Sequence, residues 1–273
     1  MIDYLEIFAY AGIATLAAMT LLWLLSLVLK NSSIVDIFWG TGFVIVTWLY
    51  FALTPEGLAV RKCLVASLVT LWGVRLSLHI LVRNWGRGED FRYKAWRDEA
   101  GRSWWWRSYF KVFLLQGVIL WLLSTPLLLA QKSAQPLGVF DVLGVLLWAI
   151  GFGFEAIGDW QLMRFKSDPV NRGKVLQSGL WRYTRHPNYF GEAVLWWGYF
   201  GFAAATGAYW TIYTPLLMTY LLLRVSGVAM LERTLVQAKP GYSDYVQRTN
   251  AFLPWVPRRG KTANDKFQKP DNK

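Results

Sequence analysis

The sequence predicts an all-α integral membrane protein with about seven transmembrane helices, its N-terminus outside and its C-terminus in the cytoplasm. Hydrophobic residues make up 55% of the 273-residue chain, and 17 residues are tryptophan, a composition typical of membrane proteins. The mean hydropathy is positive. Apolar runs of about 20 residues recur along the chain, which is the length that a helix needs to cross a bilayer core.

The apolar runs define the predicted spans. They cover residues 5–29, 34–54, 59–83, 110–131, 138–158, 190–206 and 208–231. The first run is too long for the apolar region of a signal peptide and lacks a small-residue cleavage site, so we expect it to be retained as a helix. The second run is unusual because it contains Asp36, and the sixth because it is short.

The basic residues predict the orientation. They concentrate in segments 84–110 and 159–189 and after residue 231, whereas the opposite loops hold only Arg61, Lys62 and Lys132. Because an excess of Lys and Arg marks cytoplasmic loops, this pattern predicts an outside N-terminus and a cytoplasmic C-terminus. The net charge of +12 is then a matter of topology, and it does not indicate nucleic-acid binding.

The organisation is predicted to be simple. We expect a single transmembrane domain over 1–256 and a polar, disordered tail over 257–273, which lacks apolar periodicity. No internal repeat of the kind found in many transporters is visible. The run Trp104-Trp105-Trp106, with Tyr109, is expected to form an aromatic anchor at the membrane interface.

Two familiar kinds of site are not predicted. Two histidines and the single Cys63 leave no metal-ligand cluster. Gly151, Gly153 and Gly158 have the wrong spacing for a dinucleotide fingerprint and lie inside a span, so we expect them to permit close helix packing.

Polar residues gather at the predicted cytoplasmic ends of five helices. They are Asp36, Asn84, Arg87, Glu155, Asp159, Asn188, Glu192, Arg224 and Glu232. Ionisable groups within a membrane are costly and usually functional, so together they could line one cavity open to the cytoplasm. Simpler roles stay open: Asp36 as a helix cap, Asn84 and Arg87 as ordinary helix-end residues, and Glu155 paired with Arg224. His79, which shares a helix face with Arg75, could be a satisfied core histidine.

The segment 179–192 is the most informative part of the chain. It reads Gly-Leu-Trp-Arg-Tyr-Thr-Arg-His-Pro-Asn-Tyr-Phe-Gly-Glu. Two arginines, a histidine and an asparagine at the mouth of a membrane helix suit a phosphate-bearing cofactor. Glu192 then lies inside the apolar run that follows.

These residues carry a resemblance to a family. The segment 178–192 resembles the C-terminal signature of the membrane steroid 5α-reductases and the related sterol Δ14-reductases. Segment 240–255, with Pro-Gly-Tyr-Ser-Asp-Tyr and then Leu-Pro-Trp, is similar to their closing motif, and Asn84-Trp85-Gly86-Arg87 to their Asn-x-Gly-Arg. The resemblance covers about 75–255. Arg-His-Pro-x-Tyr also occurs in S-adenosylmethionine-dependent membrane methyltransferases, which are the alternative.

The resemblance implies an NADPH site. The implied cofactor-binding residues are Asn84, Arg87, Glu155, Asp159, Lys166, Arg172, Tyr183, Arg185, His186, Asn188, Tyr189, Glu192, Arg224 and Glu232. Glu155 stands where relatives carry asparagine, and Lys166 where an arginine contacts phosphates. The family polarises a substrate carbonyl with an acid on the second helix and a tyrosine on the third. Asp36 is the implied acid, expected to act in its neutral form, whereas the third span has no tyrosine and places His79 near that position.

The implied activity is reduction of the carbon–carbon double bond of a 3-oxo-4-ene steroid, or a similar enone lipid, that enters from the bilayer. The resemblance to a bacterial homologue implies the bacterial cell membrane, with the active site facing the cytoplasm. We expect membrane lipids as neighbours and no obligate protein or nucleic-acid partner. A transporter or lipid-binding protein is the non-enzyme alternative.

Overall fold

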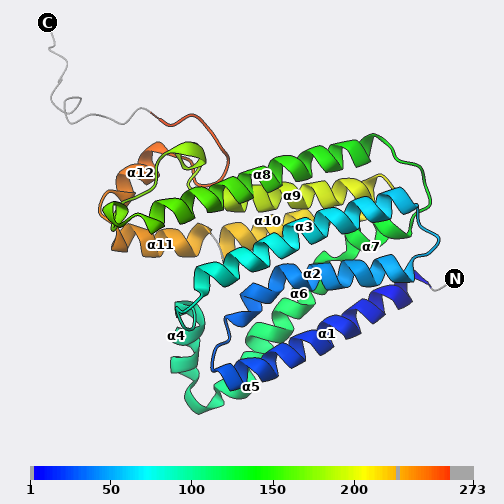
Figure 1. Ribbon diagram of the computed structural model, residues 1–273, viewed down its shortest axis with the longest axis horizontal. Coiled ribbons are helices and arrows are strands. Elements are labelled where there is room, and N and C mark those ends of the chain that lie inside the picture. The colour runs from blue at the N-terminus through cyan, green and yellow to red at the C-terminus, as the bar shows by residue number, and fades with distance from the viewer. Residues whose placement is uncertain (1–2, 226–227, 259–273) are drawn as a thin grey trace, which may run out of the picture. The chain divides into compact units, whose positions relative to one another are not determined.

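The computed structural model describes residues 3–225 and 228–258, and within these ranges the chain is helical and has no strand (Figure 1). The chain divides into two compact units. The first holds Met1–Val145 and Gly198–Thr214, and the second holds Leu146–Trp197 and Pro215–Lys273. The predicted tail lies outside the described residues except for 257 and 258. The prediction of one domain over 1–256 stays a prediction.

The longer helices of the first unit are α1 (Tyr4–Leu29), α2 (Ile34–Leu53), α3 (Ala59–Asn84), α4 (Phe91–Ala100), α5 (Trp104–Ser108), α6 (Leu115–Leu123) and α7 (Thr125–Lys132). Short 3-10 turns lie at Gly101–Ser103 (η1) and Tyr209–Ile212 (η5), and a π-helical stretch at Tyr109–Leu114 (η2). α8 (Val139–Ser167), α9 (Pro187–Ala204) and α10 (Tyr213–Tyr220) have residues in both units.

The remaining elements belong to the second unit. They are the 3-10 turns η3 (Pro169–Asn171) and η4 (Gly179–Arg182), the π-helical turn η6 (Leu221–Val225), α11 (Val228–Ala238) and α12 (Tyr242–Arg248).

Five helical segments are long and apolar enough to cross a membrane. They are Tyr4–Leu29, Ile34–Leu53, Ala59–Asn84, Phe91–Lys132 and Val139–Ser167. The first three match the predicted bounds closely, and the fourth begins earlier because 91–109, expected to lie in a cytoplasmic segment, is also helical. The sixth predicted span is helical as α9 but rich in tyrosine and tryptophan, and the seventh is divided among η5, α10, η6 and α11. The count of seven and the orientation stay predictions.

Glycine lets α2 and α3 approach each other closely. A Cβ on Gly40 would lie 2.3 Å from the Gly73 carbonyl oxygen, and one on Gly73 would lie 2.5 Å from the Gly40 carbonyl oxygen. Ser77 Oγ accepts a hydrogen bond from the Thr41 backbone N at 3.0 Å. This close contact fixes α2, and therefore the helix that carries Asp36, against α3.

A proline divides the fourth apolar segment into α6 and α7. Pro126 has no backbone N–H, so it leaves the carbonyl of Leu122 without its usual helical donor. The Tyr213 hydroxyl and the Thr125 hydroxyl donate to that carbonyl at 2.8 and 2.7 Å. Side-chain hydroxyls thus satisfy the Leu122 carbonyl at the break, as a backbone group in apolar surroundings requires.

Close helix packing recurs in the second unit, between α8 and α9. A Cβ on Gly151 would lie 2.4 Å from the Leu195 backbone N, and one on Gly191 would lie 2.4 Å from the Glu155 backbone N. Gly158 faces Pro187, 3.1 Å from its Cγ. A Cβ on Gly153 would meet no atom within 4 Å. The predicted packing role therefore holds for Gly151 and Gly158 but not for Gly153.

Candidate functional site

The first unit places Asp36 in a polar cluster. Asp36 lies in the first turn of α2, where Ser33 is the N-cap residue. Its Oδ1 accepts a hydrogen bond from the Tyr93 hydroxyl at 2.5 Å, and its Oδ2 accepts one from Arg92 Nη2 at 2.9 Å. Asp36 is therefore bound to side chains of α4 rather than acting as a cap. We call Asp36, Arg92, Tyr93 and Gln116 the acid–phenol cluster.

The phenol of Tyr93 is the centre of this cluster. Its ring is 3% exposed, and its hydroxyl oxygen also accepts a hydrogen bond from Gln116 Nε2 of α6 at 3.2 Å. The Arg92 guanidinium lies 5.4 Å from the centroid of the same ring. The Asp36 side chain is 18% exposed, so the cluster is largely buried but stays accessible at Asp36.

The local sequence explains how α4 presents these side chains. Asp90 caps the helix by accepting from the Arg92 backbone N at 3.0 Å, and it also binds Arg92 Nε at 2.8 Å. Burial alone would raise the pKa of Asp90, but the hydrogen bonds and charge of Arg92 outweigh it and lower that pKa. One cap residue therefore starts the helix and orients the arginine toward Asp36.

A second ion pair holds the turn between α1 and α2 against α4. Glu89 accepts two hydrogen bonds from Arg97, both at 2.8 Å, and one from the Ser32 backbone N at 2.6 Å. Burial raises the pKa of Glu89, but the bonds from Arg97 and Ser32 lower it overall. This contact fixes the start of α2 relative to α4.

The other candidates of the first unit lie along α3. His79 is half-buried near the end of this helix, two residues after Ser77. Asn84 is the last helical residue, and its Oδ1 accepts from Arg83 Nε at 3.2 Å. Arg87 is exposed in the turn that follows. Asn84 and Arg87 thus lie at the end of α3 and in the turn after it, and their predicted cofactor role stays a prediction.

Sequence reasoning missed Arg92, Tyr93 and Gln116. The resemblance implies a tyrosine on the third span, whereas in the structure the tyrosine that contacts Asp36 is Tyr93 of α4, a helix too polar to register as an apolar run. Asp90 followed by an aromatic residue was the available signal, because aspartate is a preferred N-cap.

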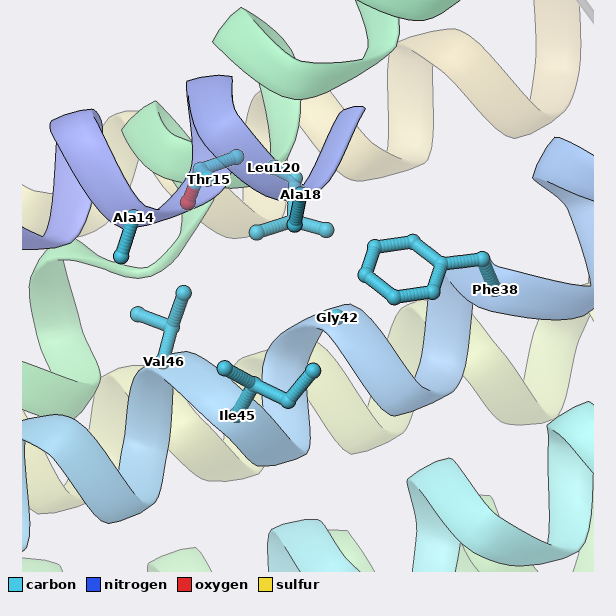
Figure 2. A pocket seen from close by; sticks show the side chains of 8 residues that line it. All are labelled: Ala14, Thr15, Ala18, Phe38, Gly42, Ile45, Val46 and Leu120. Atoms are coloured by element: carbon cyan, nitrogen blue, oxygen red, sulfur yellow. The ribbon is translucent and has the colours of Figure 1, made fainter. Parts of the chain in front are cut away.

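A small apolar hollow lies in the first unit, with a cavity volume of about 10 Å³ (Figure 2). Its lining residues are Ala14, Thr15, Ala18, Phe38, Gly42, Ile45, Val46 and Leu120. Thr15 is 5% exposed, and its hydroxyl has no hydrogen-bond partner among the described residues. Pockets that enclose drug-sized ligands measure about 300–1,000 Å³, so the hollow is far too small to enclose a lipid substrate.

The second unit brings part of the signature segment together with α11. Arg185 is 6% exposed, and its Nε donates to Glu232 Oε1 at 2.7 Å. Its Nη1 donates to the backbone carbonyls of Val246 and Thr249. His186 Nε2 lies 3.2 Å from the same Glu232 oxygen. We call Arg185, His186 and Glu232 the signature cluster.

This geometry changes the interpretation of Arg185. A phosphate ligand needs accessible N–H groups, whereas this guanidinium is buried and donates to a carboxylate and to two carbonyls. His186 likewise binds Glu232, and its ring stacks on Tyr189 with centroids 5.6 Å apart. The predicted cofactor residues Arg185, His186 and Glu232 are thus internal contacts of the second unit.

The charges in the signature cluster favour ionised Glu232. Burial alone would raise the pKa of its carboxyl group, but the hydrogen bonds from His186 and Arg185 and the charge of Arg185 lower this pKa to about 2. The carboxylate therefore stays charged at neutral pH, and it links the signature segment to α11.

The start of α9 carries an amide with an unused acceptor. Asn188 Nδ2 donates to Asp159 Oδ1 of α8 at 3.0 Å. The Asn188 Oδ1 atom is buried and has no hydrogen-bond partner among the described residues. Glu155 and Asp159, at 2% and 7% exposed, are buried on α8. A buried carbonyl oxygen without a donor is costly, so this position favours a ligand that offers an N–H or O–H group.

The remaining predicted residues of the second unit are more accessible. Lys166, Arg172, Tyr183 and Arg224 are exposed, and Glu192 is half-buried in α9. Lys166 lies in the last turn of α8, and Arg172 directly follows η3 in the loop before the signature segment. Among the described residues, no group of three His, Cys, Asp or Glu side chains could hold a metal ion.

Comparisons with known proteins find one family and one curated relative. An uncharacterized protein of Schizosaccharomyces pombe is 26% identical over 263 residues, which cover 85% of this chain and 75% of the relative. No solved structure matches the chain. The family described as "Protein of unknown function (DUF1295)" matches residues 22–249. The chain therefore belongs to this family, which is similar to the steroid 5α-reductases.

Proposed function

We propose that this protein is a membrane-embedded, NADPH-dependent reductase that saturates the carbon–carbon double bond of an enone lipid, such as a 3-oxo-4-ene steroid. The acid–phenol cluster carries the proposal, because it holds a buried phenol hydroxyl between an acid and an amide. The similarity of the family to steroid 5α-reductases supports the same reaction class.

The residues of the second unit fit NADPH in part. The unpartnered Asn188 Oδ1 suits a carboxamide N–H or a ribose hydroxyl, and the exposed cations Lys166 and Arg172 suit phosphates. Arg185 does not fit, because its guanidinium is buried and its Nε and Nη1 already donate within the second unit. When bound, NADPH would supply a hydride for the β-carbon of the enone.

The chain's own contribution is to hold and release a proton. Negative charge develops on the carbonyl oxygen of an enone during reduction, and a positioned donor stabilises it. Tyr93 Oη holds such a proton and would turn it from Asp36 Oδ1 to the carbonyl oxygen of a bound enone, while the hydrogen bond from Gln116 stabilises the phenol oxygen. Asp36 orients the hydroxyl, and Arg92 balances the charge of Asp36. This assigns proton donation to Tyr93 rather than to neutral Asp36 or to His79.

The proposal includes a location. NADPH is available in the cytoplasm, and the basic segments 84–110 and 159–189 are predicted to lie there. We therefore propose a cell-membrane enzyme whose cofactor-binding side faces the cytoplasm and whose substrate arrives from the bilayer.

The test is an assay of the detergent-purified protein. NADPH fluorescence is followed with and without progesterone or testosterone, and S-adenosylmethionine is offered as a competing ligand. We expect enone-dependent loss of NADPH and a saturated ketone product. NADPH binding without turnover would reject these substrates, and binding of S-adenosylmethionine alone would replace the reductase by a methyltransferase.

A further inference from the structure

An exposed patch of aromatic rings and cations lies on the segment from α4 to η2. Lys111 Nζ lies 4.3 Å from the Trp96 ring centroid, and the Arg107 guanidinium lies 5.5 Å from that of Trp106. The Trp106 and Phe110 rings have centroids 6.4 Å apart and are 43% and 58% exposed. We call these five residues the indole–cation patch.

The inner side of the same segment fixes the patch at the end of α1. The Trp105 carbonyl accepts from Trp23 Nε1 at 2.8 Å, and Trp104 Nε1 donates to Ser32 Oγ at 3.3 Å. Trp104 is 3% exposed, so it is a packing residue and not the expected interfacial anchor. Ser32 lies in the turn between two candidate membrane spans, α1 and α2, and α5 lies beside that turn (Figure 1). The patch therefore lies beside the turn that joins two candidate membrane spans.

The two cations of the patch contact aromatic rings but form no ion pair among the described residues. Among the described residues, neither Arg107 nor Lys111 has a carboxylate within ion-pair distance. Neighbouring cations differ: Arg92 and Arg97 pair with carboxylates of the same unit at 2.8–2.9 Å. Arg107 and Lys111 are exposed, and no acidic residue occurs between residues 101 and 114.

We infer that the indole–cation patch binds the phosphate of an anionic glycerophospholipid. Tryptophan and phenylalanine favour the boundary between acyl chains and headgroups, where one end of the ring system is apolar and the other is wet. Basic residues beside a span are attracted to anionic headgroups. The indole rings hold the two exposed cations in place by cation–π contacts, so the anionic headgroup is attracted to one defined position.

The experiment uses the full chain in detergent and native mass spectrometry with added phosphatidylglycerol or phosphatidylcholine. The test variant is Arg107→Ser with Lys111→Ser. The matched control, Lys94→Ser with Arg248→Ser, removes two exposed cations from α4 and α12. Each cation is expected to contribute about fivefold to the affinity for phosphatidylglycerol. We therefore expect the test variant, which lacks both, to bind this lipid roughly thirtyfold more weakly than the native chain. The control should bind like the native chain.

A single reversal, Lys111→Glu, guards against a folding defect in the double variant. It should weaken phosphatidylglycerol binding more than Lys111→Gln does, with the same unfolding temperature in lipid-free detergent. Equal affinity for the two lipids, or equal loss in the control variant, would overturn the inference. Displacement of the lipid by inorganic phosphate would also overturn it, because the patch would then bind a free anion.

Discussion

The phenol of Tyr93 reaches Asp36 from a helix that hydropathy does not reveal. The resemblance supplied the acid, Asp36, but its expected partner position on α3 holds no tyrosine. A phenol from α4 stands beside the acid instead. The contact joins residues 57 positions apart, so spacing along the chain could not predict it.

Tyr93→Phe tests the proposed proton donor. The substitution removes the hydroxyl and keeps the buried ring, so we expect a loss of turnover on the order of a hundredfold or more, while NADPH binding is unchanged. Steady-state kinetics and fluorescence titration measure the two effects. Tyr109→Phe, whose hydroxyl contacts Thr20 at 3.2 Å, is the matched control and should turn over normally. Full activity in the Tyr93 variant would reject the assignment.

Glu232 gives the second unit a pH-dependent stability. Its pKa is lowered from 4.5 to about 2 in the folded chain, so the stabilisation is complete above the unfolded pKa and is lost as the pH falls from there toward the folded pKa. With allowance for solvent screening, we expect ionised Glu232 to contribute on the order of 2 kcal/mol to the free energy of unfolding. Unfolding temperatures measured across this range should fall more steeply for the native chain than for Glu232→Gln. Parallel curves would contradict this.

The residues of the signature segment were predicted better as a group than one by one. Their cations and aromatic rings marked the segment as a candidate site, which stays a prediction, and the partners of Arg185 come 47 to 64 residues later. Sequence order does not reveal which cation is buried and which stays exposed. Lys166 and Arg172, which resemble Arg185 as charges, are exposed.

At the level of elements, apolar length was a reliable guide for the first three helices. Length does not report internal breaks, so Pro126 and the π-helical turns η2 and η6 were not predicted. Apolar length also fails to predict helices that carry both polar and apolar side chains, such as α4. The spacing of glycines predicted close packing of α8, but only contact geometry distinguishes Gly151 from Gly153.

Two substitutions in α8 test that distinction. Gly151→Ala would place a Cβ 2.4 Å from the Leu195 backbone N, and backbone cannot move aside easily, so we expect destabilisation by about 1–3 kcal/mol. Gly153→Ala meets open space, and the better helix propensity of alanine should stabilise by roughly 0.5–1 kcal/mol. Thermal unfolding of the two variants should shift in opposite directions; a shared direction would argue against this α8–α9 packing.

For the whole molecule, the charge pattern makes the orientation testable. We start from Cys63→Ala, because Cys63 is exposed and is the one cysteine of the chain. Ala134→Cys lies in a predicted outer loop, and Lys174→Cys in a predicted cytoplasmic loop; both positions are exposed. A membrane-impermeant maleimide should label Ala134→Cys in intact cells and Lys174→Cys only after permeabilisation. The reverse pattern would invert the orientation.

The contacts of the signature segment also bear on the order in which the chain can be completed during synthesis. Thr184 donates to the carbonyls of Ala251 and Phe252, and the Arg185 backbone N donates to that of Asn250. Thr184 is separated from its two acceptors by 67 and 68 residues. These bonds cannot form until the ribosome has released almost the entire described chain. A premature stop codon shortly before codon 245 would therefore yield a chain that has every candidate span but lacks these three acceptors. The second unit of that chain could not complete its fold and would be exposed to quality-control proteases.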